Sequence, residues 1–204
     1  MIPTHRVVTR KLWYVLRVSP QSPQDWAEEQ AARVAQEVRR LRRDRGRSAQ
    51  WLADRTAELG YTVTRPVIAD LENGRRKYVT TAELVVLARA LNTTPIALLY
   101  PDPVSDDEIK MLPTADVSVS SGFALQWFSG LVDVPTDFIC DDAAEYLANL
   151  KPVETARQIW ELDGQKAALM KEGLDKSGKE KREILLAIAQ VQRQIDKLRG
   201  TDGG

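Results

Sequence analysis

Apolar residues recur at spacings of three and four through most of residues 26–100, the spacing of one face of an α-helix. The first such stripe predicts an amphipathic helix from Trp26 to Gly46. Asp25 is its expected N-cap, Glu28 completes a capping box, and Gly46 is the expected stop. The residues expected to face inward are Ala27, Ala31, Val34, Val38 and Leu41.

Further helices are predicted over residues 48–60, 80–92 and 95–101. Ser48 is the expected N-cap of the first, and Asn92 is the expected stop of the second. The residues expected to face inward are Leu52, Thr56 and Leu59 in the first, and Leu84, Leu87, Ala88 and Leu91 in the second.

Between these lies the segment TRPVIADLENG, residues 64–74, which predicts a helix of only about two turns. Thr64 can cap it, and Pro66 fits its first turn because the missing N–H is not needed there. The pair Asn73-Gly74 is expected to end it in a left-handed turn. A helix this short is not stable alone, so neighbouring helices must hold it.

The second half of the chain shows a heptad pattern over residues 156–198. Its early members are Ala156, Trp160, Asp163, Ala167, Met170 and Leu174. Its last five form a clean coiled-coil seam: Ile184, Ile188, Val191, Ile195 and Leu198. The pattern fails at Ser177 and Lys181, which predicts two helices, about 153–172 and 179–199. We expect an antiparallel hairpin that dimerises through the five-residue seam. The alternative is a hairpin that packs only on its own domain.

Turn residues and composition divide the rest of the chain. Residues 1–25, which end in SPQSPQD, are predicted to be an N-terminal arm and linker, 102–115 a linker, and 200–204 a disordered tail. This leaves a first domain over 26–101 and a dimerisation or partner domain over 116–199. In the latter, the run FALQWFSGLVDV fits either a strand or a helix.

The net charge of zero hides a split between the two halves. Residues 1–100 carry 17 Lys and Arg against 10 Asp and Glu, whereas residues 101–204 carry 12 against 19. The basic residues of the first half are 15 Arg and 2 Lys. This asymmetry indicates two functional halves, the first suited to a polyanion.

The residue counts disfavour several classes of protein. One cysteine, Cys140, allows no intrachain disulfide and fits a reducing compartment. No apolar run has the length of a membrane span, and the N-terminus does not have the pattern of a signal peptide, so we expect a cytoplasmic protein. His5, the only histidine, lies in the arm, and no phosphate-binding glycine loop is present. We therefore expect no enzyme, no catalytic residue, no metal and no cofactor.

Five helices in about seventy residues, with a short capped helix third, form a recognisable arrangement. The runs VRRLRRDRG, SAQWLADR, VTRPVIADLENGRRK and LVVLARALNTTPIALL resemble the helix-turn-helix domain of the lambda repressor and Cro family, also called the Xre family. The resemblance covers about residues 34–100. It implies a mainly α fold: a five-helix DNA-binding domain, followed here by a mostly helical C-terminal domain that ends in the hairpin.

The resemblance implies that the third helix lies in the major groove of DNA. The residues placed at or near the bases are then Arg65, Pro66, Val67 and Asp70. Arg65 is the strongest candidate, because a guanidinium can bond guanine O6 and N7 together. Its alternative role is a phosphate contact. Asp70 would accept from cytosine N4 or reject wrong sequences.

The resemblance also assigns phosphate contacts and a structural pair. The expected phosphate contacts are Ser48, Gln50, Thr64, Arg75, Arg76, Lys77 and Tyr78. Arg42 and Glu72 match a buried ion pair of the family. The stretch from Leu52 to Ile68 is about five residues longer than usual in the family, so either the second helix or the turn after it is extended.

These observations favour a sequence-specific regulator of transcription that binds double-stranded DNA as a homodimer, in a bacterium or phage. A repressor, of phage or prophage immunity type, is favoured because repression needs only occupancy of a promoter. One alternative is an antitoxin or adaptor that binds a partner protein through its C-terminal half. Another is a nucleoid-associated architectural protein.

Overall fold

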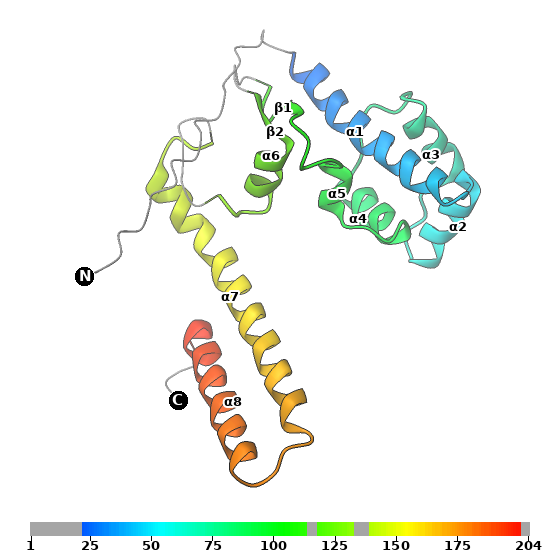
Figure 1. Cartoon of the computed structure of the whole chain (residues 1–204). Coiled ribbons are helices and arrows are strands. Elements are labelled where there is room, and N and C mark those ends of the chain that lie inside the picture. Colours follow the sequence, from blue (N-terminus) through cyan, green and yellow to red (C-terminus); the bar gives the residue numbers. More distant parts are fainter. Residues whose placement is uncertain (1–21, 114–117, 133–138, 201–204) are drawn as a thin grey trace. The chain divides into compact units, whose positions relative to one another are not determined.

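A computed structural model describes residues 22–113, 118–132 and 139–200 of the 204-residue chain. The described residues up to Leu131 form one compact unit, and those from Val132 form a second (Figure 1). The chain is mainly helical and carries a two-stranded antiparallel sheet. The predicted arm at residues 1–21, His5 included, and the predicted tail at 201–204 lie outside the described residues.

Helix α1, Pro23–Asp44, begins earlier than predicted. Its N-cap is Ser22, whose hydroxyl accepts a hydrogen bond from the backbone N–H of Asp25 at 3.1 Å. The predicted cap at Asp25, with its capping box at Glu28, is therefore wrong. Pro23 fits the first helical position because no N–H is needed there. Asp25 instead lies in the first turn, where its negative charge interacts favourably with the helix dipole.

Helices α2, Ala49–Glu58, and α3, Arg65–Glu72, follow. Ser48 caps α2 as predicted, its hydroxyl accepting from the N–H of Trp51 at 3.0 Å. Helix α3 has eight residues, and Gly74, at φ +71°, turns the chain after it in the left-handed conformation that glycine adopts freely. The short third helix is therefore confirmed.

Helix α4, Thr81–Ala90, starts with a capping box in which the side chains of Thr80 and Glu83 each bond the other's backbone N–H. Asn92, at φ +56°, ends it as predicted. Helix α5, Pro95–Leu99, completes the set of five.

These five helices enclose one apolar core. One fully buried side chain from each is Val38, Leu52, Ile68, Leu87 and Leu98, all 0% exposed. The apolar residues that were expected to face inward over residues 26–100 are thus buried or partly buried, with the exception of Ala27, which is exposed. The burial explains why an eight-residue helix such as α3 is held in place.

A small sheet follows the five helices in the same unit. Strands β1, Glu108–Lys110, and β2, Ser118–Ser120, pair antiparallel with Ile109 opposite Val119. Strand β1 lies inside the segment 102–115, which we predicted to be a linker.

Helix α6, Ser121–Phe128, follows β2 directly, so the first part of FALQWFSGLVDV is helical. The ring of Phe128 meets Tyr100, at the end of α5, edge-on with centroids 5.8 Å apart. The indole N–H of Trp26 in α1 donates to the carbonyl of Lys110 at 3.1 Å. These contacts attach the sheet and α6 to the five-helix core.

The second unit contains an antiparallel helical hairpin of α7, Ala143–Gly173, and α8, Gly178–Arg199, side by side in Figure 1. The predicted hairpin is confirmed, but α7 starts ten residues before the expected position 153 and passes through Pro152. Asp142 caps its start by accepting from two backbone N–H groups, and Leu150 is buried. Both stabilise the segment that precedes the proline and offset the hydrogen bond lost there.

Helix α8 meets α7 through the predicted seam of Ile184, Ile188, Val191, Ile195 and Leu198, which are half-buried or, for Ile195, fully buried. The half-buried stripe of α7 is Thr155, Ile159, Leu162, Lys166, Leu169 and Gly173. The predicted α7 positions, which include Trp160, Met170 and Leu174, are instead exposed. The predicted register of α7 is wrong by one residue, because both stripes have heptad spacing and the spacing alone does not decide which one faces α8.

No helix within the described residues has the length and apolar character that crossing a membrane requires.

Candidate nucleic-acid interface

Helix α3 buries one side and exposes the other. Ile68 and Leu71 are 0% and 2% exposed and belong to the core. Arg65 and Pro66, at the N-terminal end, are exposed. Thr64 precedes them as the N-cap residue, and its side chain makes no capping hydrogen bond. The N-terminal end of α3 is therefore the part that can meet a ligand.

The other two predicted base contacts are less exposed. Val67 is partly buried and packs against the core. Asp70 is partly buried and its carboxylate lies 3.4 Å from the guanidinium of Arg75. Both line a shallow hollow that also includes Lys77 and Tyr78 of the loop after α3.

The connection from α2 to α3, residues 59–64, is closed by one buried threonine. The hydroxyl of Thr56 donates to the carbonyl of Ala53 at 2.8 Å and accepts from the N–H of Val63 at 2.9 Å. Val63, 2% exposed, fills the core. Helix α2 ends at Glu58, Gly60 at φ +87° lies in the turn before α3, and α2 and α3 pack against each other.

The C-terminal end of α3 is tied to α1 by the predicted pair of Arg42 and Glu72. Two parallel hydrogen bonds join the guanidinium to the carboxylate, with Nε to Oε1 at 2.7 Å, and the side chains are 10% and 7% exposed. The hydrogen bonds with Glu72 raise the pKa of Arg42 above its ordinary value. Arg42 also donates to the carbonyl of Arg47, so one side chain joins α1, α3 and the start of α2.

At the start of α2, Gln50 is exposed and donates to Asp54 at 2.7 Å, whereas the Ser48 hydroxyl caps the helix. The guanidinium of Arg47 lies 3.9 Å from the ring centroid of Trp51, a cation–π contact. Its Nη1 is buried and has no acceptor among the described residues. Sequence reasoning missed Arg47; its position just before the N-cap and four before a tryptophan was the available signal.

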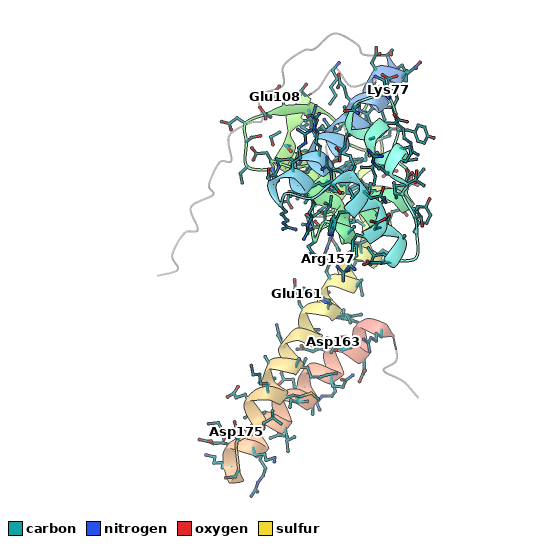
Figure 2. The ribbon with its side chains drawn as sticks, turned by 90° about the vertical axis from the view of Figure 1, so that its right-hand side faces the viewer. Lys77, Glu108, Arg157, Glu161, Asp163 and Asp175 are labelled. Carbon is teal, nitrogen blue, oxygen red and sulfur yellow. The ribbon has the colours of Figure 1, made fainter. Side chains whose placement is uncertain are left out.

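Each of the three basic residues in the loop after α3 forms an ion pair with an acidic residue of the same chain. Arg75 faces Asp70 across a pair in which the two side chains are 77% and 46% exposed. Lys77, labelled in Figure 2, lies 3.1 Å from the carboxylate of Glu28 in α1, and its side chain is 58% exposed. Exposed pairs of this kind are weak and can exchange one partner for a phosphate.

Arg76 is held more firmly. Its guanidinium lies 2.6 Å from the carboxylate of Glu83, with the two side chains 15% and 11% exposed, and it stacks 4.2 Å from the ring centroid of Tyr78. The hydrogen bond with Glu83 raises the pKa of Arg76. Burial alone would raise the pKa of Glu83, but hydrogen bonds from Arg76 and Thr80 outweigh it and lower that pKa. Arg76 therefore links the loop to the capping box of α4.

Within the described residues, no group of three His, Cys, Asp or Glu side chains is arranged to hold a metal ion. The seam residues Ile184 to Leu198, predicted to mediate dimerisation, lie in the second unit against α7 of the same chain.

Comparison with known proteins agrees with this geometry for one segment. Residues 33–99 match a family model described as a helix-turn-helix domain, about a third of the chain. None of the curated proteins and none of the solved structures matches the chain. The matched segment contains the second half of α1 and all of α2 to α5, the elements that build the core and expose the end of α3. Residues 33–99 are therefore a helix-turn-helix domain, as the resemblance to the Xre family indicated, and such a domain points to DNA binding.

Proposed function

We propose that this protein is a sequence-specific regulator of transcription that binds double-stranded DNA through α3 and represses by occupying its site. The observation that carries the proposal is the exposed N-terminal end of α3, with Arg65 first, on a helix whose opposite side is locked into the core. A helix presented in this way can enter a major groove without disturbing its own domain.

Arg65 is the proposed base-reading residue. Its exposed guanidinium can donate two hydrogen bonds to guanine O6 and N7, which is worth about 1–3 kcal/mol of discrimination against another base. Pro66 offers apolar contact to a thymine methyl. Asp70 faces Arg75 and acts by rejecting sequences that place an acceptor beside it.

The proposed phosphate contacts surround this end of α3. Thr64, Arg75 and Lys77 are exposed, and each of the two cations can exchange a partly exposed carboxylate partner for a phosphate. On α2 we add Arg47 to the predicted Ser48 and Gln50, because Trp51 holds its guanidinium beside the helix N-terminus. We assign Arg76 to loop support, since its pair with Glu83 is mostly buried.

One domain of this size reads too few base pairs to select a site in a genome, so we propose that the functional form is a dimer on a two-part operator. Repression is favoured over activation because occupancy alone suffices for it. A phage or prophage immunity repressor is the narrower form of this proposal.

The test is selection of binding sequences from a pool of random DNA duplexes, followed by affinity measurements at several salt concentrations. We expect a two-part motif and, with about six phosphates neutralised per bound unit, a log K against log salt slope near −5. Equal binding of all sequences with the same salt dependence would instead identify an architectural nucleoid protein. An absence of salt-dependent DNA binding would contradict the proposal.

A second candidate is an adaptor or antitoxin that binds a protein partner through its C-terminal half. It is favoured by the exposed apolar side chains of the hairpin, such as Trp160 and Leu186. This function would be favoured if one other protein co-purified in stoichiometric amount and the complex contained a single copy of this chain in place of a homodimer.

A further inference from the structure

Helix α7 carries a second apolar stripe that α8 does not cover. Trp160, Met170 and Leu174 are 79%, 52% and 76% exposed. Ala167 lies between them, and the spacings of seven, three and four place all four on one side of the helix. Single exposed apolar residues are ordinary on a protein surface, but a row of them along one helix marks an interaction surface.

The stripe is arranged symmetrically about Ala167. Trp160 lies seven residues before it and Leu174 seven after. If a second copy of α7 packs antiparallel with its Ala167 opposite this one, Trp160 of each copy lies opposite Leu174 of the other. Gly164 and Met170 lie three residues before and after Ala167. In the antiparallel pair, the long side chain of Met170 in one copy therefore lies opposite Gly164 in the other, which has no side chain. A twofold contact requires this kind of self-complementarity.

The charged residues of this side obey the same symmetry. Asp163 and Lys171 lie four residues before and after Ala167, so the twofold places an acid beside a base at two points. Asp163 lies beside α8, as Figure 2 shows, 3.5 Å from Lys166 and 3.4 Å from Arg199, with its side chain 42% exposed. Its charge is thus partly compensated within its own chain, and it does not repel a second copy.

Gly164 supplies an independent observation. Glycine inside a helix is destabilising relative to alanine, and a Cβ built at Gly164 meets no atom within 4 Å in its own chain. The single chain therefore gives no steric reason for a glycine at this position. The close approach of Met170 of a second copy gives one.

We propose that two copies of this protein dimerise through the exposed stripe of α7, antiparallel and with the twofold axis at Ala167. This inference rests on the proposed function in that it names the surface through which the regulator becomes a dimer. It assigns the five-residue seam of α8 to the hairpin within each chain, and the stripe of Trp160 and Leu174 to the contact between chains.

The test is the mass of the full-length protein in solution without DNA, by sedimentation equilibrium. We expect about twice the chain mass of 22.9 kDa for the wild type, and at least a tenfold weaker dimer for Trp160→Lys. The matched control is Leu186→Lys, because Leu186 is 70% exposed on the side of α8 that faces away from α7. This control is expected to leave the dimer unchanged.

Cysteine cross-linking tests the position of the axis. In a Cys140→Ser background, Ala167→Cys should form a disulfide-linked dimer under mild oxidation, because the two copies of a residue on the twofold axis lie close together. The neighbouring Ala168→Cys, which points to another side of α7, should not.

Either of two results would overturn the inference: a monomeric wild type, or a dimer that Trp160→Lys leaves intact and that position 168 cross-links as readily as position 167. If Trp160→Lys fails to fold, the cross-linking pair decides. The mass is measured without DNA, so a missing dimer and a missing DNA affinity are seen separately.

Discussion

The helix-turn-helix domain and the hairpin use the same residue types to different ends. In the first, every one of the five helices contributes a fully buried apolar side chain to one core. In the second, among the described residues from 139 onward, only Leu150 and Ile195 are buried, while Trp160 and Leu174 are more than three quarters exposed. The first unit thus buries apolar side chains from every helix of its five-helix core, whereas the hairpin leaves a row of them exposed on α7, which is the observation behind the proposed contact surface.

The polar contacts differ in the same way. The ion pairs of the first unit include two that are mostly buried, Arg42 with Glu72 and Arg76 with Glu83. The ion pairs of the hairpin are more exposed: in the pair of Asp163 with Arg199, the side chains are 42% and 49% exposed. Buried pairs fix elements at one geometry, whereas exposed pairs contribute little. Buried ion pairs therefore hold α3 and the loop after it in place in the first unit, whereas the exposed ion pairs of the hairpin fix little of its geometry.

The largest expected effect comes from breaking the buried pair. Glu72→Gln leaves the Arg42 guanidinium buried without its counter-ion and should lower the free energy of unfolding by about 3–5 kcal/mol. Asp163→Asn in the hairpin should cost less than about 1 kcal/mol. Urea denaturation with hydrogen exchange resolved by peptide measures both. Equal costs would show that burial of the pair does not distinguish the two units.

A core substitution should have a somewhat smaller effect. Leu87→Ala, at a fully buried site, should cost about 3 kcal/mol, because methyl groups are lost and a cavity remains. Ile184→Ala, in the half-buried seam of α8, should cost roughly half as much. The same denaturation experiment compares them. A larger cost at Ile184 would mean that the hairpin is the better packed unit.

The smallest of the three effects concerns acid. Because the pKa of Glu83 is lowered from its ordinary value of 4.5 in the folded protein, its contribution to stability is present above about pH 4.5 and is lost as the pH falls through the folded pKa. The wild type should therefore lose more stability than Glu83→Gln between pH 6 and pH 3. Hydrogen exchange in α4 is the measurement. If the stability of the two proteins changed in parallel with pH, the lowered pKa of Glu83 would not be the origin of the acid sensitivity.

Sequence reasoning recovered the first unit better than the second, for a physical reason. Residues such as Ser48, Gly74 and Asn92 determine local backbone geometry by themselves, so helix ends could be placed from them. Which of two heptad stripes faces α8 depends on contacts across the hairpin, and the heptad spacing that predicts the stripe with Trp160 is shared by the stripe one residue earlier.

The candidate site shows the same limit. The pair of Arg42 and Glu72 followed from the family resemblance and is present. That Arg76 is tied to Glu83, and that Arg47 stacks on Trp51, depends on side-chain geometry that charge counting does not contain. Ser22 was missed as the N-cap of α1 because Asp25 offered a second acceptable cap three residues later.

One set of DNA affinities tests whether α3 reads the base sequence through Arg65. Wild type and Arg65→Ala are each titrated with the selected operator and with duplexes in which one base pair per half-site is replaced in turn. We expect the affinity of the wild type to fall about 10- to 100-fold when one guanine position is replaced, and Arg65→Ala to lose that discrimination there and nowhere else. If Arg65→Ala instead binds every duplex more weakly by the same factor, Arg65 contacts a phosphate and α3 does not read the sequence through it.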